Sequence, residues 1–173
     1  MKREQLEHLI RAAAAIVNQP DVVVIGSQAI LGQFSSAPAE LLVSVEADVF
    51  PRHHPELSIQ IDGAIGELSP FHQTFGYYAH GVDETTATIP PGWENRLVPL
   101  SNANTGGATG WCLEVHDLAV SKLVAGREKD VAFVAALLRH NMVDRAELIL
   151  RVKSLPLSGD RLDVLLARLG RMA

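Results

Sequence analysis

The chain has 173 residues, 47% of them hydrophobic and 20% charged, so it is long and apolar enough to bury the core of one domain. Its formal net charge is −5, and a sequence pI near 5.8 disfavours a basic nucleic-acid-binding module. Residues 21–138 carry five basic and fourteen acidic side chains. Such an acidic region is either ordinary solvated surface or a place that holds cations.

The sequence also excludes several other classes of protein. Its one cysteine, Cys112, permits no disulfide within the chain and no cysteine-based zinc site. Glu4, Glu7 and Arg11 interrupt the N-terminal segment, which therefore lacks the apolar core of a signal peptide. No run approaches the roughly 20 apolar residues that a transmembrane helix needs. We therefore expect a cytoplasmic protein without a membrane segment.

The first predicted elements are a helix and a buried strand. Leucine, isoleucine and alanine recur at helical spacing over residues 3–18, and Pro20 ends this helix. Residues 22–25, VVVI, are typical of a strand that is buried on both faces. Gly26 and Ser27 follow directly, and Ser27 is a favourable N-cap for a helix that begins there.

The rest of the chain predicts a small sheet followed by helices. Further strands are expected at 41–50, 57–62, 85–89, 96–100 and 111–115, with residues 101–110 as a glycine-rich hairpin loop. Helices are expected at 116–126, 127–141, 143–155 and 158–172. We therefore predict one α+β domain over 1–173, in two layers. A mixed sheet and an N-terminal helix occupy 1–115, and a helical C-terminal part occupies 116–173.

Two acidic side chains stand out on an apolar predicted strand. Because strand side chains alternate, Glu46 and Asp48 share one face, with Cα atoms roughly 6.5–7 Å apart, so that their carboxylates can converge on one ion. An exposed edge strand would explain the same pattern. Asp62, at the end of the predicted strand 57–62, gains weight as a third acid only if its strand pairs beside theirs.

Two further groups are candidates for binding phosphate. Gly26-Ser27 is either a phosphate-binding turn or only an N-cap, and it is not a Walker loop because no Gly-Lys-Ser/Thr follows. Lys122, Arg127, Lys129 and Asp130 form either a cationic group for phosphates or a solvated helix face with an ion pair. On one continuous helix, residues 122 and 129 would share a face. His53 and His54 are expected in a loop. His72 and His80, eight residues apart in an irregular aromatic segment, are interpreted as ordinary residues of that segment, with a metal-binding pair as the alternative.

Taken together, these segments resemble the nucleotidyltransferase superfamily. The resembling parts are VVVIGSQAI, then SVEADVF, and then HDLAVSKLVAGREKD, which looks like the helical motif of the minimal and AbiEii-like branch. The match covers residues 20–62 and 113–138 in the expected order. It implies a mixed-sheet nucleotidyltransferase fold, with a helical C-terminal part.

The resemblance also implies an activity and a site. A nucleoside monophosphate would pass from an NTP to an acceptor hydroxyl with Mg²⁺ or Mn²⁺ as the metal. The metal and catalytic residues would be Glu46, Asp48 and Asp62, and the nucleotide-binding residues would be Gly26, Ser27, Lys122, Arg127 and Asp130. The acceptor would be a tRNA, a protein or a small molecule, and the toxin-like branch suggests the first two.

Two alternatives stay open from the sequence. Glu46 stands where the superfamily usually has Asp, so the protein is alternatively a nucleotide-binding or partner-binding module that has lost catalysis, for example in a toxin–antitoxin pair. A further alternative is a structural homodimer that uses the aromatic segment 71–93 as its interface.

Overall fold

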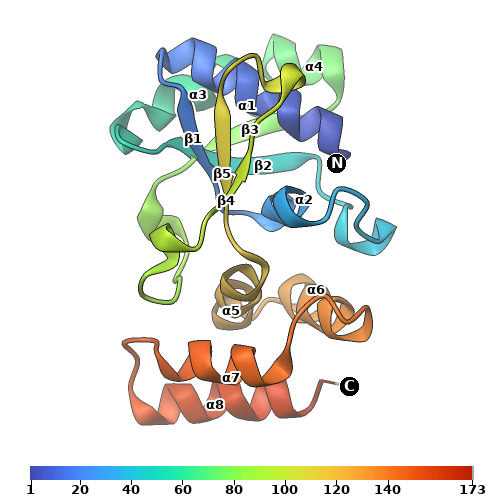
Figure 1. The fold of residues 1–173 in the computed structure, drawn as a ribbon, viewed down its shortest axis with the longest axis vertical. Coiled ribbons are helices and arrows are strands. Elements are labelled where there is room, and N and C mark those ends of the chain that lie inside the picture. Colours follow the sequence, from blue (N-terminus) through green and yellow to red (C-terminus); the bar gives the residue numbers. More distant parts are fainter. Residues whose placement is uncertain (173) are drawn as a thin grey trace.

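The computed structural model describes residues 1–172, and its centre is a five-stranded mixed sheet (Figure 1). The strands are β1 (Asp21–Val24), β2 (Glu46–Pro51), β3 (Tyr78–Gly81), β4 (Val98–Leu100) and β5 (Thr109–Cys112). Their order is β3-β2-β1-β5-β4. β1 pairs in parallel with β5 and antiparallel with β2, whereas β3 pairs in parallel with β2 and β4 antiparallel with β5.

Eight α-helices accompany the sheet in the described residues. They are α1 (Arg3–Val17), α2 (Ile30–Gln33), α3 (Ser58–Ile65), α4 (Pro70–Phe75), α5 (Val115–Ala125), α6 (Glu128–Arg139), α7 (Arg145–Lys153) and α8 (Gly159–Gly170). All strands precede α5, and only helices follow it. The predicted α+β class, the N-terminal helix and the helical C-terminal part are thus confirmed. None of the helices in residues 1–172 is long and apolar enough to cross a bilayer.

The core forms where apolar faces of helices cover the sheet. Leu6, Leu9 and Ile10 on α1 are fully buried, as expected from their helical spacing. α1 and α3 contact the strands, and Figure 1 shows α1, α3 and α4 gathered away from the C-terminal helices. Val22–Val24 of β1 are buried in the middle of the sheet, which explains the continuous β-branched run of that strand.

The predicted strand at 57–62 is wrong, because this segment is helical. A 3-10 turn at Pro55–Leu57 leads into α3 at Ser58. Ile61 and Ile65, four residues apart, are buried, whereas Ile59 is 75% exposed. The apparent alternation of apolar residues therefore comes from one turn of a helix, whose buried positions are spaced by four.

The strand predictions between residues 41 and 89 also need correction. The strand expected at 41–50 begins only at Glu46, after a 3-10 turn at Ala39–Leu41. The strand expected at 85–89 is absent from the described residues, since Glu84–Thr86 is a 3-10 turn capped by Asp83. The actual strand in this segment is β3, in the part predicted to be irregular.

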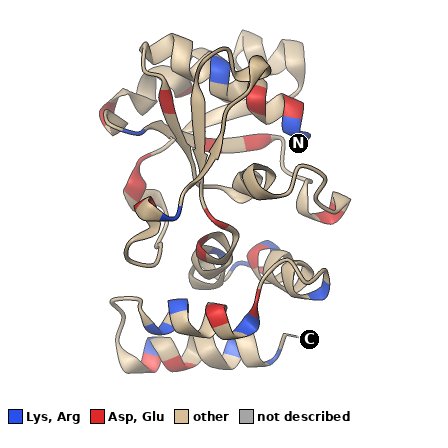
Figure 2. Ribbon diagram, in the orientation of Figure 1, with Lys and Arg blue, Asp and Glu red and all other residues tan. Residues whose placement is uncertain are grey.

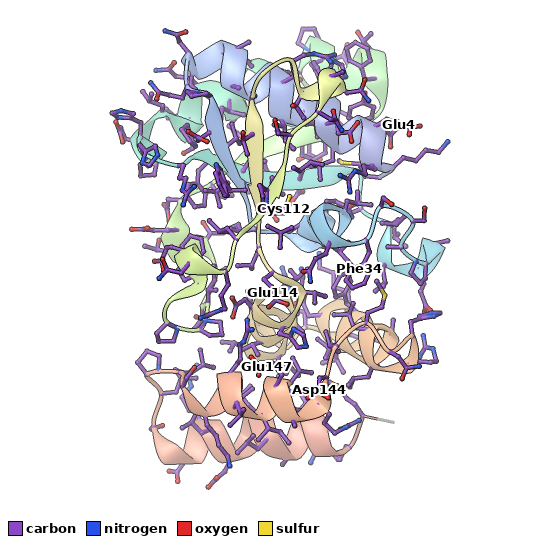
Figure 3. The ribbon with its side chains drawn as sticks, in the orientation of Figure 1. Glu4, Phe34, Cys112, Glu114, Asp144 and Glu147 are labelled. Atoms are coloured by element: carbon purple, nitrogen blue, oxygen red, sulfur yellow. The ribbon has the colours of Figure 1, made fainter. Side chains whose placement is uncertain are left out.

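A buried ionic cluster joins the sheet-containing part to the C-terminal helices. Asp117 on α5 is fully buried and binds Arg96, which precedes β4, through bonds of 2.8 and 2.9 Å. Arg151 on α7 lies 2.8 Å from Asp117 and 2.6 Å from Glu114. Glu114, labelled in Figure 3, is the N-cap of α5 and accepts backbone hydrogen bonds from residues 116 and 117. These ion pairs therefore hold together the segment before β4, the start of α5 and helix α7.

This cluster predicts an acid-sensitive part of the stability. Burial opposes ionisation of Glu114, but the His116 hydrogen bond and the charges of His116 and Arg151 outweigh it and lower its pKa from 4.5 to about 2. A depressed carboxyl pKa stabilises the folded state above pH 4.5, and this stabilisation is lost as pH falls towards 2. Glu114→Gln should therefore reduce the free energy of unfolding by about 2 kcal/mol near neutral pH.

Urea denaturation of the wild type and Glu114→Gln, at a series of pH values, measures this difference. It should shrink through the acid range, and a constant difference would contradict the expectation. Glu56→Gln is the matched control, because Glu56 is 67% exposed and, within residues 1–172, forms an ion pair only with His54.

Candidate functional site

Two neighbouring parallel strands place four polar side chains on one face of the sheet. In the register of β2 and β3, Glu46 lies opposite Tyr78 and Asp48 lies opposite His80. Ala47, between the two acids, is fully buried on the other face. Strand alternation therefore directs both carboxylates away from the core, as the sequence predicted.

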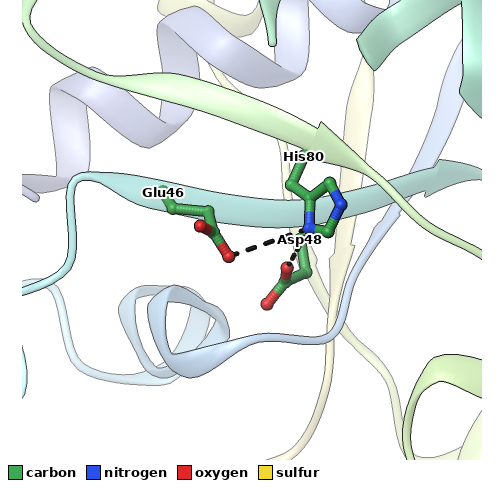
Figure 4. Close-up of side chains that lie close together, drawn as sticks. All are labelled: Glu46, Asp48 and His80. Atoms are coloured by element: carbon green, nitrogen blue, oxygen red, sulfur yellow. Dashed lines mark hydrogen bonds and ion pairs between the residues drawn. The ribbon is translucent and has the colours of Figure 1, made fainter. Parts of the chain in front are cut away.

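The side chains of this face form a compact cluster (Figure 4). His80 Nδ1 lies 3.2 Å from Asp48 Oδ1 and 3.8 Å from Glu46 Oε1. Tyr78 donates a 2.8 Å hydrogen bond to Glu46 Oε2, which fixes that carboxylate and leaves its other oxygen towards His80. One ligand atom each of Glu46, Asp48 and His80 lies within 4.8 Å of the others.

The two acids differ in their electrostatic environment. Burial and the negative charge of Glu46 raise the pKa of Asp48. Burial also opposes ionisation of Glu46, but hydrogen bonds from Tyr78 and Asp48 and the charge of His80 lower its pKa. Two carboxylates this close repel each other when both are ionised, and a cation between them would remove that cost.

A glycine brings the backbone against the side chain of Asp48. A Cβ atom added at Gly26 would lie 2.0 Å from Asp48 Oδ2 and 2.8 Å from its Cγ, so a larger residue here would have to displace this carboxylate. The Ile25 N–H also donates a 3.1 Å hydrogen bond to the Asp48 carbonyl oxygen. The Gly26-Ser27 turn and Asp48 therefore lie in direct contact, although 21 positions separate Ser27 from Asp48 in the sequence.

The structure corrects the expected role of Ser27 as an N-cap. Gly26 is the cap residue, and Ser27 begins a 3-10 turn that ends at Ala29. The α2 helix that follows has only four residues. A helix this short carries a small dipole, so binding of phosphate here would depend on individual backbone N–H groups.

The acidic cluster and the predicted phosphate-binding residues line the same pocket, which has a volume of about 800 Å³. One side is formed by the Gly-Ser turn and the cluster, and the other by the end of α5 and the start of α6. The lining residues include Gly26, Ser27, Glu46, Asp48, His80, Lys122, Arg127, Lys129 and Asp130. Figure 2 shows that the C-terminal helices carry most of the basic residues. Negative and positive groups therefore face one cavity.

The basic residues are organised around one buried acid. Asp130 is 1% exposed, and its carboxylate lies 2.6 Å from Arg127 Nε and 3.2 Å from Lys122 Nζ. Burial raises the pKa of Asp130, but Arg127 and Lys122 outweigh this and lower it. Gly126, at φ 65°, ends α5 as the sequence predicted, so Lys122 and Lys129 do not share the face of one continuous helix. The ion pairs bring the two helices' basic residues together instead.

Asp62 lies outside this arrangement. It is on helix α3, and its Oδ1 accepts a 3.2 Å hydrogen bond from the Gly81 backbone. Among the described residues, it belongs neither to the cluster of Glu46, Asp48 and His80 nor to the pocket lining. His80 stands where the third acid was expected. Sequence reasoning missed it because β3 was not recognised, although Tyr78 and His80 show the spacing of two side chains on one strand face.

A substitution at Gly26 tests the packing of the site. Gly26→Ala should lower the free energy of unfolding by about 1–3 kcal/mol, because its Cβ overlaps the Asp48 carboxylate. Chemical denaturation measures the change. Gly63→Ala is the matched control: Gly63 lies in α3, no described heavy atom lies within 4 Å of its added Cβ, and alanine favours helix. Equal effects of the two substitutions would contradict the close contact at Gly26.

The donor set of the cluster fits a divalent cation. Two carboxylates and one imidazole nitrogen converge within 4.8 Å, which is a suitable set of donor atoms for such an ion. The pocket beside them is large enough for a nucleotide-sized ligand, and pockets of this kind are about 300–1,000 Å³. The residues present are therefore compatible with a metal and a phosphate-bearing ligand side by side.

The site combines paired acids on β2 of a mixed sheet, a Gly-Ser turn beside them and basic residues in the same pocket. This is the arrangement of a nucleotidyltransferase. The chain belongs to the family described as Nucleotidyltransferase of unknown function (DUF6036), whose family model matches residues 4–155. The matched range begins within α1 and ends after α7, so it contains every residue of the pocket. Searches of curated proteins and of solved structures each found no match.

Proposed function

We propose that this protein transfers a nucleoside monophosphate from an NTP to an acceptor hydroxyl, with Mg²⁺ or Mn²⁺ as the metal. The observation that carries the proposal is the shared pocket, which Glu46, Asp48 and the Gly-Ser turn line together with Lys122 and Arg127. Carboxylates suit divalent metals, and the basic side chains suit the phosphates of the nucleotide. Family membership supports the same class of reaction.

Each part of the pocket has a role in this reaction. Glu46 and Asp48 hold the metal, and the metal supplies charge neutralisation at the reacting phosphate. Lys122, Arg127 and Lys129 balance the charge of the phosphates, with Asp130 fixing the first two. The acceptor oxygen forms a bond to the α-phosphorus while the bond from that phosphorus to the β-phosphate bridging oxygen breaks. Pyrophosphate leaves, and the hydroxyl proton passes to a carboxylate of the site.

Calorimetry with ATP, GTP, CTP and UTP, each with and without Mg²⁺ or Mn²⁺, tests the nucleotide part of the proposal. We expect metal-dependent binding of at least one nucleotide. An absence of such binding at millimolar nucleotide would overturn the proposal. Transfer is then followed with an α-phosphate label on the bound nucleotide, offered with tRNA, total protein and small hydroxyl compounds as acceptors.

The motif at 117–130 supports the AbiEii-like branch as a finer proposal. In that branch we propose a tRNA or a protein as the acceptor and a cognate partner protein, as in a toxin–antitoxin pair. Expression of the wild type should then slow growth, whereas the Glu46→Ala, Asp48→Ala double variant should not. Equal growth with both proteins would argue against a toxin.

A second candidate function is nucleotide or partner binding without transfer. Two observations favour it: Glu46 is one methylene longer than the usual Asp, and Tyr78 already holds one of its oxygens at 2.8 Å. Mg²⁺ demands near-ideal octahedral geometry, so such a change matters for catalysis. Metal-dependent binding with no labelled product would support this candidate over the first.

A further inference from the structure

His80 occupies the position from which a third ligand would complete the acidic cluster. It lies opposite Asp48 in the parallel β2–β3 register and on the same face as Glu46. Its Nδ1 lies 3.2 Å from Asp48 Oδ1 and 3.8 Å from Glu46 Oε1 (Figure 4). Three donors from adjacent strands therefore point to one place.

We propose that His80 is a third protein ligand of the metal, through Nδ1, and that the site consequently prefers Mn²⁺ to Mg²⁺. The use of this metal in nucleotidyl transfer depends on the proposed function, whereas its binding by the three residues does not. His80 would then replace the all-oxygen set expected from Glu46, Asp48 and Asp62.

The preference follows from the chemistry of the ligands. Mg²⁺ is a hard ion that takes oxygen ligands in a strict octahedron at about 2.0–2.1 Å and gives up water reluctantly. First-row transition metals accept imidazole nitrogen, and Mn²⁺ also favours carboxylate oxygen. A set of two carboxylates and one imidazole therefore suits Mn²⁺ better than it suits Mg²⁺.

The geometry lets His80 bind without rearrangement of the strands. Ligation requires a free electron pair on Nδ1 with the proton on Nε2, and the side chain is 49% exposed, so Nε2 is able to reach water. The Tyr78 hydrogen bond holds Glu46 Oε2, which leaves Oε1 for the ion. Each of the three residues thus keeps one donor atom directed at the shared position.

The competing explanation is that His80 only forms a hydrogen bond or an ion pair with the two carboxylates. The same short distances serve that role in the absence of metal. The two explanations predict different magnetic coupling with bound Mn²⁺. If the imidazole is a ligand, its nitrogen couples to the electron spin of the ion. If the imidazole does not bind the ion, this coupling is absent.

Electron spin resonance of the full chain with Mn²⁺, without nucleotide, separates these explanations. We expect ¹⁴N coupling to Mn²⁺ in the wild type and its loss in His80→Ala. Mn²⁺ affinity should fall by about 10-fold or more in His80→Ala, while Mg²⁺ affinity, measured by competition, should change by less than about 3-fold. His80→Asp should shift the preference towards Mg²⁺, because it restores an all-oxygen set.

His53→Ala is the matched control, because His53 is exposed and lies outside the pocket lining in the described residues. It should keep both the coupling and the affinities, and circular dichroism checks that each variant is folded. Absence of ¹⁴N coupling in the wild type, or equal changes in Mn²⁺ and Mg²⁺ affinity in His80→Ala, would overturn the inference. Coupled Mn²⁺ without any NTP binding would refute the proposed function and leave the His80 ligand intact.

Discussion

Asp48→Asn should abolish metal-dependent nucleotide binding while leaving the free energy of unfolding unchanged or higher. Asparagine keeps the size of the side chain and an oxygen acceptor, but it removes the charge that a divalent cation needs. The loss in metal affinity should be at least about 100-fold, because a direct ligand matters more than the residues that merely orient ligands. Calorimetry of metal and nucleotide binding, with chemical denaturation of the same samples, measures both quantities.

The opposite direction of the two effects makes this prediction specific. Burial and the charge of Glu46 raise the pKa of Asp48, so its ionised form is costly in the metal-free protein. A neutral isostere relieves that cost, whereas a variant that failed through misfolding would lose stability as well as binding. Simultaneous loss of both would therefore argue against a metal role for this carboxylate.

Asp62→Asn is the matched control, since it makes the same chemical change on helix α3. Asp62 accepts the 3.2 Å hydrogen bond from Gly81 and, within the described part of the chain, does not line the pocket. Metal and nucleotide binding should survive this substitution. If Asp62→Asn instead abolished binding and Asp48→Asn did not, the site would have been assigned to the wrong acid.

Arg151→Ala should cause the largest loss of stability, about 3–5 kcal/mol. Arg151 binds Asp117 at 2.8 Å and Glu114 at 2.6 Å, and Asp117 is fully buried. Removing the arginine leaves these buried negative charges with less compensation, which is more costly than losing an exposed ion pair. Arg151 also binds Glu147 on its own helix at 2.6 Å. Urea denaturation followed by circular dichroism measures the change.

Arg139→Ala is the matched control for this second prediction. Arg139 also binds a glutamate at 2.6 Å, but both side chains of the Arg139–Glu40 pair are about half exposed. An exposed pair of this kind contributes at most about 1 kcal/mol. If the two variants lost similar amounts of unfolding free energy, burial would not explain the contribution of the Asp117 cluster to stability.

Part of the site was predictable because it depends on neighbouring residues in the chain. The alternation of Glu46 and Asp48 places both acids on one strand face, and a buried strand followed by Gly26-Ser27 predicts a tight turn at the strand end. Gly126 likewise ends α5 as expected. These features follow from backbone periodicity and from the conformations that glycine permits.

Other predictions were wrong because the local sequence pattern was compatible with more than one secondary structure. The segment 57–62 alternates apolar and polar residues over a stretch too short to distinguish a strand from a single helical turn. β3 has only four residues, and its neighbours at 70–75 form a helix, so the segment appears irregular from composition alone. The sequence pattern therefore places His80 in an irregular segment and Asp62 at the end of a strand, whereas the structure has His80 on β3 and Asp62 on α3.

The amino-acid sequence by itself determined the α+β class, the helical C-terminal part and the shared face of the two acids. Only the tertiary structure decided which residues meet them. The parallel pairing of β2 with β3 brings His80 opposite Asp48, and Asp130 gathers Lys122 and Arg127 on the far side of the pocket. These partners come from positions distant in the chain. Their positions depend on strand register and on the pairing of a buried charge, which local periodicity does not determine.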